Sequence, residues 1–144
     1  MPIEILLVED THGDVRLTEE AFREANNFIR IHVVSDGLQA MGFLRQKGKY
    51  GSAPRPDLIL LDLNLPLMDG REVLSIIKKD DGLKSVPVFI VTASDLKADV
   101  ELCDEYSGTR YHRKPVHWDG FESLAKDICD LWRVKDGVKK HTTQ

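Results

Sequence analysis

Five short runs of β-branched and other apolar residues alternate along this chain with segments in which apolar residues recur every three or four positions. The five runs are Ile3–Val8, Ile29–Val34, Leu58–Leu61, Val86–Val91 and Gly108–His112. Strands that alternate with helices favour a parallel sheet, because right-handed crossovers place helices over both of its faces. We therefore predict an α/β fold built on a doubly wound, five-stranded parallel sheet.

The segments between the runs carry the usual signals of helix ends. Asp14 is expected to cap the first helix, and Asn26 follows its last apolar position. Residues 47–56 are rich in Gly, Ser, Pro and basic side chains and are expected to form a long loop. The other helices are expected after the turns at Gly37 and Gly70, over Asp95–Glu105, and from Trp118 to about Val134.

Composition narrows the class of protein without naming a partner. With 144 residues, 42% apolar and 31% charged, the chain is expected to form one soluble domain. A net charge of −4 argues against a domain that grips nucleic acid, so no direct nucleic-acid partner is expected. The apolar runs are too short to cross a bilayer and no leader pattern precedes them, so we expect no membrane contact and a cytoplasmic location. Cys103 and Cys129 show no metal-binding spacing and are interpreted as thiols of a reducing compartment.

Polar residues stand where the predicted strands end. Glu9 and Asp10 follow the first run, Asp62 the third and Lys114 the fifth, and Thr92 ends the fourth. Ligands of such sheets bind beyond the carboxyl ends of the strands, so these residues are predicted to form one site. Taken singly, each is an ordinary cap, strand or surface residue. Their convergence on one edge of one sheet is what predicts chemistry.

Three carboxylates at one place can all remain ionised if a cation shares their charge. Hard oxygen ligands without thiolate or paired imidazole favour Mg²⁺ or Mn²⁺. The lysine supplies a second positive charge. A carboxylate beside a divalent ion and a lysine is suited to attack a phosphoryl group, because both cations neutralise charge on the transferring oxygens.

Four motifs carry a resemblance to a known family, and it extends from Ile3 to about Trp132. They are Leu6–Asp10 (LLVED), Asp62–Gly70 (DLNLPLMDG), Val91–Ser94 (VTAS) and Tyr111–Pro115 (YHRKP). Together they resemble the receiver domain of two-component response regulators. Residues 49–66 and 70–74 further resemble the single-domain regulators that accompany cyanobacterial and bacterial phytochromes. The resemblance implies a flavodoxin-like receiver fold with strand order 2-1-3-4-5.

The resemblance also implies a role for the three acidic residues Glu9, Asp10 and Asp62 and for Asn64. Asp62 would be the phosphoacceptor, the site of phosphorylation. Asp10 and Asp62 would bind Mg²⁺, or Mn²⁺, directly. Glu9 would orient a metal-bound water, and Asn64 would contribute its backbone carbonyl.

On the other side of the site, the resemblance implies a conformational switch. Thr92 would bond to the phosphoryl oxygens after transfer, and Tyr111 would swing inward when Thr92 moves. Lys114 would pair with Asp62 before transfer and with the phosphoryl group afterwards. Pro115 would follow a cis peptide bond, and the small Ala93 would leave the site open to donors.

The implied donor is a sensor histidine kinase, with a phytochrome-type kinase as the specific candidate. Residues 1–134 would form the receiver and residues 135–144 a tail, with no effector domain. The signal would then leave through protein contact, and a homodimer is one candidate for it. Such a protein catalyses its own phosphorylation and dephosphorylation and is not otherwise an enzyme.

Three other functions compete with this reading. A phosphatase or phosphotransferase with an aspartyl-phosphate and a dehalogenase-like site needs an acid two residues beyond the nucleophile, where this chain has Asn64. A degenerate receiver that serves as an interaction module would lack part of the chemistry, but every residue needed is present. A flavin carrier would want a phosphate-binding loop after the first strand, where Glu9, Asp10 and Asp14 would repel an anion.

Overall fold

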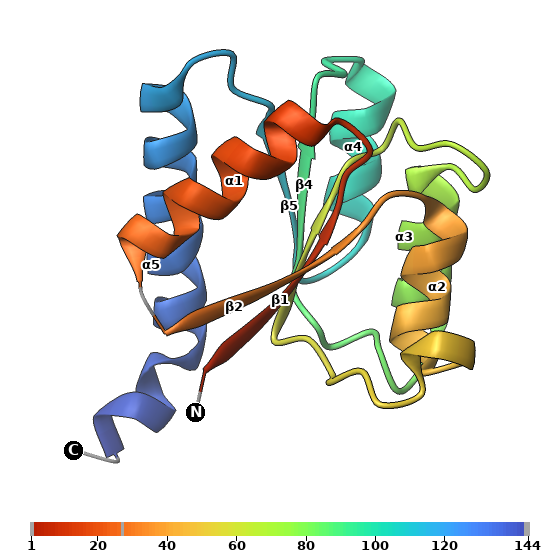
Figure 1. Ribbon diagram of the computed structural model, residues 1–144, viewed down its shortest axis with the longest axis horizontal. Coiled ribbons are helices and arrows are strands. Elements are labelled where there is room, and N and C mark those ends of the chain that lie inside the picture. The colour runs from red at the N-terminus through yellow and green to blue at the C-terminus, as the bar shows by residue number, and fades with distance from the viewer. Residues whose placement is uncertain (1, 27, 143–144) are drawn as a thin grey trace.

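The computed structural model describes the backbone of residues 2–26 and 28–142, and the side chains of residues 2–26 and 28–132. Strands and helices alternate along it (Figure 1). The strands are β1 (Ile3–Val8), β2 (Ile29–Val34), β3 (Leu58–Leu61), β4 (Val88–Thr92) and β5 (Thr109–Arg113). The helices are α1 (His12–Ala25), α2 (Gly37–Arg45), α3 (Gly70–Lys79), α4 (Lys97–Glu105) and α5 (Trp118–Thr142), with a 3₁₀ turn, η1, at Gly48–Tyr50.

The five strands form one parallel sheet in the order β2-β1-β3-β4-β5. Helices α1 and α5 cover one face, and α2, α3 and α4 cover the other (Figure 1). The predicted fold class and strand order are therefore confirmed. No helix in the described part of the chain is long and apolar enough to cross a membrane.

Alternate residues of the central strands belong to two separate apolar cores. Ile5 and Leu7 of β1 pack with Phe22 of α1 and with α5. Leu6 and Val8 pack with the helices on the opposite face. Both sides of a central strand are thus covered, which is why β1 and β3 read as continuous apolar runs rather than as alternating ones.

Two carboxylates set the entry into helices at the carboxyl edge of the sheet, which is the edge formed by the carboxyl ends of the parallel strands. Asp36 accepts a hydrogen bond from the backbone N–H of Gln39 at 2.7 Å and caps α2. Asp69 accepts one from the N–H of Arg71 at 2.7 Å and caps α3. Both caps follow the expected pattern of a polar residue before the first helical turn.

The structure shifts two predicted strands, with β4 at Val88–Thr92 rather than Val86–Val91 and β5 at Thr109–Arg113 rather than Gly108–His112, and it corrects three helix boundaries. Helix α1 begins at His12 with Thr11 at its N-cap, so Asp14 lies inside the first turn and is not the cap. Helix α4 begins at Lys97 rather than at Asp95. The backbone of α5 continues to Thr142, past the predicted end at Val134. Propensity places such ends poorly, because an exposed last turn and a continuing helix have similar sequences.

Candidate functional site

The acidic residues predicted to form a site meet at the carboxyl edge of the sheet. Glu9 and Asp10 directly follow β1, and Asp62 directly follows β3, the strand paired with β1. One carboxylate oxygen from each of the three lies within 4.8 Å of the others. Glu9 and Asp62 are buried, whereas Asp10 is exposed. The cluster thus opens to solvent through Asp10, which suits a site that admits a hydrated cation.

Backbone contacts hold Asp62 in place. Its N–H donates to the carbonyl of Val8 at 3.1 Å, which extends the pairing of β1 and β3 by one residue. The N–H of Asn64 donates to Oδ1 of Asp62 at 3.1 Å. Gly70 begins α3 so close by that a Cβ there would lie 2.2 Å from the carbonyl oxygen of Asp62. A glycine is therefore required for α3 to begin beside this aspartate.

Lys114, which directly follows β5, extends its side chain into the same cluster. Its Nζ lies 2.5 Å from Oε1 of Glu9, 3.1 Å from Oδ2 of Asp62 and 3.1 Å from Oδ2 of Asp14. The predicted pairing of Lys114 with Asp62 is present. Asp14, interpreted from sequence as a helix cap, turns out to be a partner of this lysine.

The backbone at Lys114 is held without the predicted cis peptide bond. Its N–H donates to the carbonyl of Thr92 at 2.8 Å, which continues the pairing of β4 and β5. The described residues contain no cis peptide, so the cis bond expected before Pro115 is wrong. Trans is the lower-energy form of a prolyl bond, and the strand pairing already sets the course of the chain here.

Burial and opposite charge act against each other in this cluster. Burial raises the pKa of the Glu9 carboxyl to about 7, even though the hydrogen bond and charge of Lys114 act to lower it. For Lys114, burial acts to lower the pKa of the ammonium. The hydrogen bond to Glu9 and the charges of Asp62 and Glu9 outweigh burial and raise that pKa above its usual value. The lysine is accordingly a fixed positive charge at neutral pH.

The predicted switch residues lie on the neighbouring strands. Thr92 ends β4 and is fully buried, and its Oγ1 accepts a hydrogen bond from the N–H of Ser94 at 3.4 Å. Tyr111 lies on β5, which pairs with β4, and its hydroxyl donates to the carbonyl of Ser94. Both residues therefore hold the same point of the β4–α4 loop.

Sequence reasoning missed a second polar cluster beside this loop. Arg71 of α3 forms an ion pair with Asp99 of α4, and Asp99 also accepts a hydrogen bond from the hydroxyl of Ser94. Asp99 is 4% exposed, which is rare for a carboxylate. The sequence signal was faint, since an Asp in the first turn of a helix is common for reasons of helix dipole alone.

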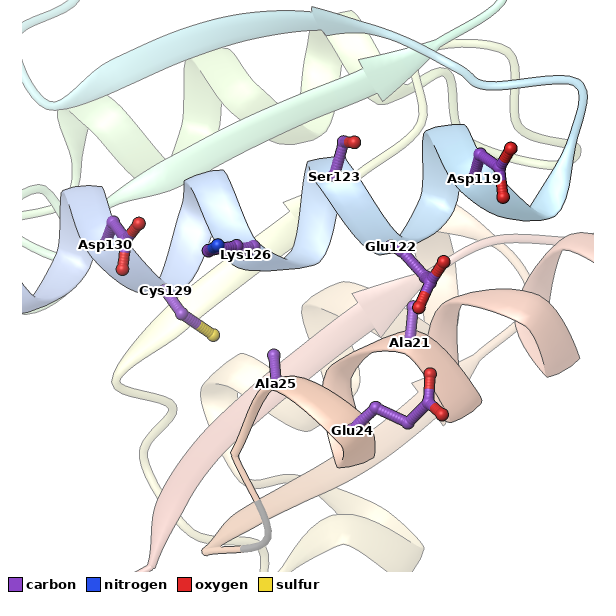
Figure 2. A pocket seen from close by; sticks show the side chains of 9 residues that line it. All are labelled: Ala21, Glu24, Ala25, Asp119, Glu122, Ser123, Lys126, Cys129 and Asp130. Atoms are coloured by element: carbon purple, nitrogen blue, oxygen red, sulfur yellow. The ribbon is translucent and has the colours of Figure 1, made fainter.

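A hollow lies elsewhere, between α1 and α5 (Figure 2). Figure 2 shows Ala21, Glu24 and Ala25 on α1 facing side chains of α5, with the sulfur of Cys129 directed toward α1. The remaining lining residues are Asp119, Glu122, Ser123, Lys126 and Asp130. None of the predicted site residues lines this hollow, so it is separate from the carboxyl-edge cluster.

A family model described as the response regulator receiver domain matches residues 5–125. The chain belongs to this family. Among curated proteins, the receiver is 39% identical over 138 residues to response regulator Rcp1 of Synechocystis, a match that covers 96% of this chain and 87% of that protein.

Solved structures give the same answer for the fold. The Mn²⁺-bound form of response regulator Rcp1 is 41% identical with a TM-score of 0.84, over 91% of this chain and 94% of that one. The phosphorylated cyanobacterial phytochrome response regulator RcpA is 40% identical with a TM-score of 0.86, over 92% and 94%.

The predicted resemblance to phytochrome response regulators is therefore confirmed. The receiver is a signalling protein of the two-component type, a class whose partners are histidine kinases. The acidic cluster beside Asp62 is able to hold a divalent metal ion. The phosphatase and the degenerate interaction module are not favoured.

Proposed function

We propose that Asp62 accepts a phosphoryl group from a phosphohistidine of a sensor histidine kinase. One oxygen of Asp62 attacks the phosphorus and an O–P bond forms. The P–N bond to the donor imidazole breaks, and its electron pair stays on the nitrogen, which takes up a proton. The observation that carries the proposal is the meeting of Asp62 with two further carboxylates and with Lys114 at one edge of the sheet.

The donor set fits a hard divalent cation, and we propose Mg²⁺ as the native one. Asp10, Asp62 and the backbone carbonyl of Asn64 would hold it, and Glu9 would orient a bound water. The ion supplies neutralisation of the charge that spreads over the phosphoryl oxygens. The Mn²⁺-bound form of Rcp1 supports a divalent ion at such a site.

Lys114 supplies the protein's own positive charge to the reaction. It already contacts Asp62, so its ammonium lies where charge develops on the transferring group. After transfer, the phosphoryl group carries about one and a half to two negative charges. Lys114 and Thr92 then bond to its oxygens, and Tyr111 follows the movement of Thr92. The population shifts toward the switched state only by as much as the phosphoryl group binds that state more strongly than the other.

Exposed apolar side chains support a protein as the donor. Leu38, Leu67, Leu96 and Val116 are 53%, 77%, 61% and 84% exposed. They lie in segments that follow β2, β3, β4 and β5, so all four stand at the carboxyl edge. Apolar side chains exposed around a charged site favour contact with a protein partner. We propose that a phytochrome-type kinase docks here.

Labelling by acetyl phosphate tests the phosphoacceptor. Asp62→Asn is expected to abolish Mg²⁺-dependent labelling, because the amide is not a nucleophile toward phosphorus. Asp81→Asn, at a carboxylate that is 93% exposed in the loop after α3, is the matched control and keeps full labelling. Undiminished labelling of Asp62→Asn would contradict the assignment. Steady release of phosphate from simple phosphomonoesters would revive the phosphatase.

Phosphotransfer from a phytochrome-type kinase tests the docking surface. Val116→Ser is expected to slow transfer from the kinase by roughly tenfold, while labelling by acetyl phosphate stays unchanged. Phe28→Ser is the control, since Phe28 is 70% exposed but precedes β2 at the opposite edge. Equal transfer rates for both variants would place the kinase elsewhere.

The output is proposed to pass through protein contact, with self-association as the first candidate. Sizing the protein with Mg²⁺ and beryllofluoride, a phosphoryl mimic, against the untreated protein tests it. A change of oligomeric state identifies self-association as the output. An unchanged state points to a separate target protein.

A further inference from the structure

A bidentate ion pair between Arg71 and Asp99 joins helices α3 and α4. Nε of Arg71 donates to Oδ1 of Asp99 at 2.7 Å, and Nη2 donates to Oδ2 at 2.7 Å. Two parallel bonds between a guanidinium and a carboxylate fix the relative orientation of both groups as well as their distance. The pair therefore constrains where α4 begins relative to α3.

The same arginine reaches back to the loop that follows Asp62. Its Nη1 lies 3.1 Å from Oδ2 of Asp69 and 3.5 Å from the carbonyl oxygen of Leu63, the residue next to Asp62. Because Asp69 caps α3, these contacts tie Arg71 to both ends of the β3–α3 loop. One side of the ion pair is thus anchored to the segment that carries the phosphoacceptor.

The other side of the ion pair is anchored to the β4–α4 loop. Oδ2 of Asp99 accepts a hydrogen bond from the hydroxyl of Ser94 at 2.5 Å. The carbonyl of Ser94 accepts from the hydroxyl of Tyr111, and its N–H lies 3.4 Å from Oγ1 of Thr92. Arg71 and Asp99 therefore hold, from the α3 side, the residue that Thr92 and Tyr111 hold from the sheet.

The burial of Asp99 argues that this arrangement is specific. The hydrogen bond from Arg71 keeps the pKa of the Asp99 carboxyl below its usual value, so the carboxylate stays charged although its side chain is 5% exposed. A buried ion pair is a weak source of stability compared with apolar packing, but it demands one geometry. Asp95, in the same loop, forms an ion pair with Arg113 at 3.5 Å. Both of these side chains are about two-thirds exposed, so this second ion pair constrains the loop less than the buried one does.

We propose that Arg71 is a positioning residue for phosphoryl transfer, holding the β4–α4 loop through Asp99 and Ser94 so that Thr92 faces the group arriving at Asp62. The inference rests on the proposed function of Asp62. Without the ion pair, the loop samples other positions, and the cost of ordering it falls on the transfer step. The proposed metal site, which is formed by Glu9, Asp10, Asp62 and the carbonyl of Asn64, lies outside the β4–α4 loop, so metal affinity is expected not to depend on this loop.

The rate of labelling by acetyl phosphate at saturating Mg²⁺ tests the proposal, with Mn²⁺ affinity measured in parallel by electron paramagnetic resonance. Asp99→Asn keeps the shape of the side chain and removes its charge. It is expected to slow labelling on the order of tenfold and to leave Mn²⁺ affinity unchanged. Asp95→Asn, four positions earlier, is the matched control and labels at the wild-type rate.

Substitutions of the other two members complete the test. Arg71→Gln is expected to match Asp99→Asn, and Arg71→Lys to recover part of the rate, since a lysine keeps the charge but loses the two-pronged bond. Ser94→Ala combined with Asp99→Asn is expected to be no slower than Asp99→Asn alone, because both act through one loop.

The outcomes separate this inference from the proposed function. Wild-type protein that fails to label would overturn the role of Asp62. Equal labelling rates for the wild-type protein and Asp99→Asn would overturn the role of Arg71 and leave the role of Asp62 intact. A loss of Mn²⁺ affinity that parallels the loss of rate would mark the pair as a general structural element and would also overturn it. If Arg71→Gln does not fold, Arg71→Lys and Asp99→Asn decide the matter.

Discussion

Two glutamates at opposite ends of β1 are both held by basic side chains, but their surroundings differ in charge. Glu4, near the start of the strand, lies 3.1 Å from Nε2 of His32 and 3.5 Å from Nη1 of Arg30 on the neighbouring strand. Glu9, just past the end, shares Lys114 with two other carboxylates. Among the described contacts, Glu4 has an arginine and a histidine as side-chain partners, whereas Glu9 shares a single ammonium with two other carboxylates.

That difference separates a structural ion pair from a site. A carboxylate whose charge is already neutralised by basic neighbours does not attract a further cation. Three carboxylates that converge on one ammonium leave a net negative charge. A bound metal ion would balance that charge. The position at the carboxyl edge says where a ligand binds, and the charge imbalance says which kind.

Removal of Lys114 should have the largest effect at the Glu9 end of β1. Lys114→Met keeps much of the apolar stem and deletes the charge beside Asp62. We expect labelling by acetyl phosphate to fall by about a hundredfold, the usual cost of losing one preorganised electrostatic partner of a transition state. Arg113→Met, at the exposed neighbour, is the control. A rate within twofold of wild type would exclude an electrostatic role for Lys114.

Addition of Mg²⁺ should have the next largest effect, and it should act at the Glu9 end of β1 alone. At about one hundred times its dissociation constant, an ion that binds the folded state alone adds roughly 2.7 kcal/mol to the free energy of unfolding. Thermal unfolding of the wild-type protein should therefore shift upward by several degrees. Asp10→Asn should lose the shift, and Glu4→Gln should keep it. An equal shift in both variants would mean that the ion binds outside the acidic cluster.

The titration of Glu9 gives a pH test in the presence of a chelator. Burial raises the pKa of Glu9 from an ordinary 4.5 to about 7 in the folded protein. Stability that comes from the raised pKa is present below 4.5 and is lost as pH rises through about 7. Glu9→Gln should flatten that decline by on the order of 2 kcal/mol, measured by urea unfolding from pH 5 to 8. Parallel stability curves for the variant and the wild type would show that the pKa of Glu9 is not raised in the folded protein.

The acidic cluster could be predicted from sequence because each member directly follows or ends a strand. Asp62 lies at the carboxyl edge once Leu58–Leu61 is a strand, whatever the helices do. Asp14 and Asp99 lie inside helices, where their partners depend on how α1 and α4 sit on the sheet. Helix packing is set by many small contacts, so the partners Lys114 and Arg71 could not be assigned from spacing alone.

The smallest effect is expected at the balanced end of β1. Glu4→Gln removes a carboxylate whose side chain is 12% exposed and whose partner Arg30 is largely exposed. Partly exposed ion pairs contribute little, so we expect a loss of about 0.5 to 1 kcal/mol in the free energy of unfolding and an unchanged rate of labelling. Urea unfolding and the acetyl phosphate assay measure the two quantities on one preparation. If Glu4→Gln slowed labelling as Lys114→Met does, charge imbalance would not be what distinguishes the two ends of β1, because the balanced cluster would then contribute to the chemistry at the opposite edge of the sheet.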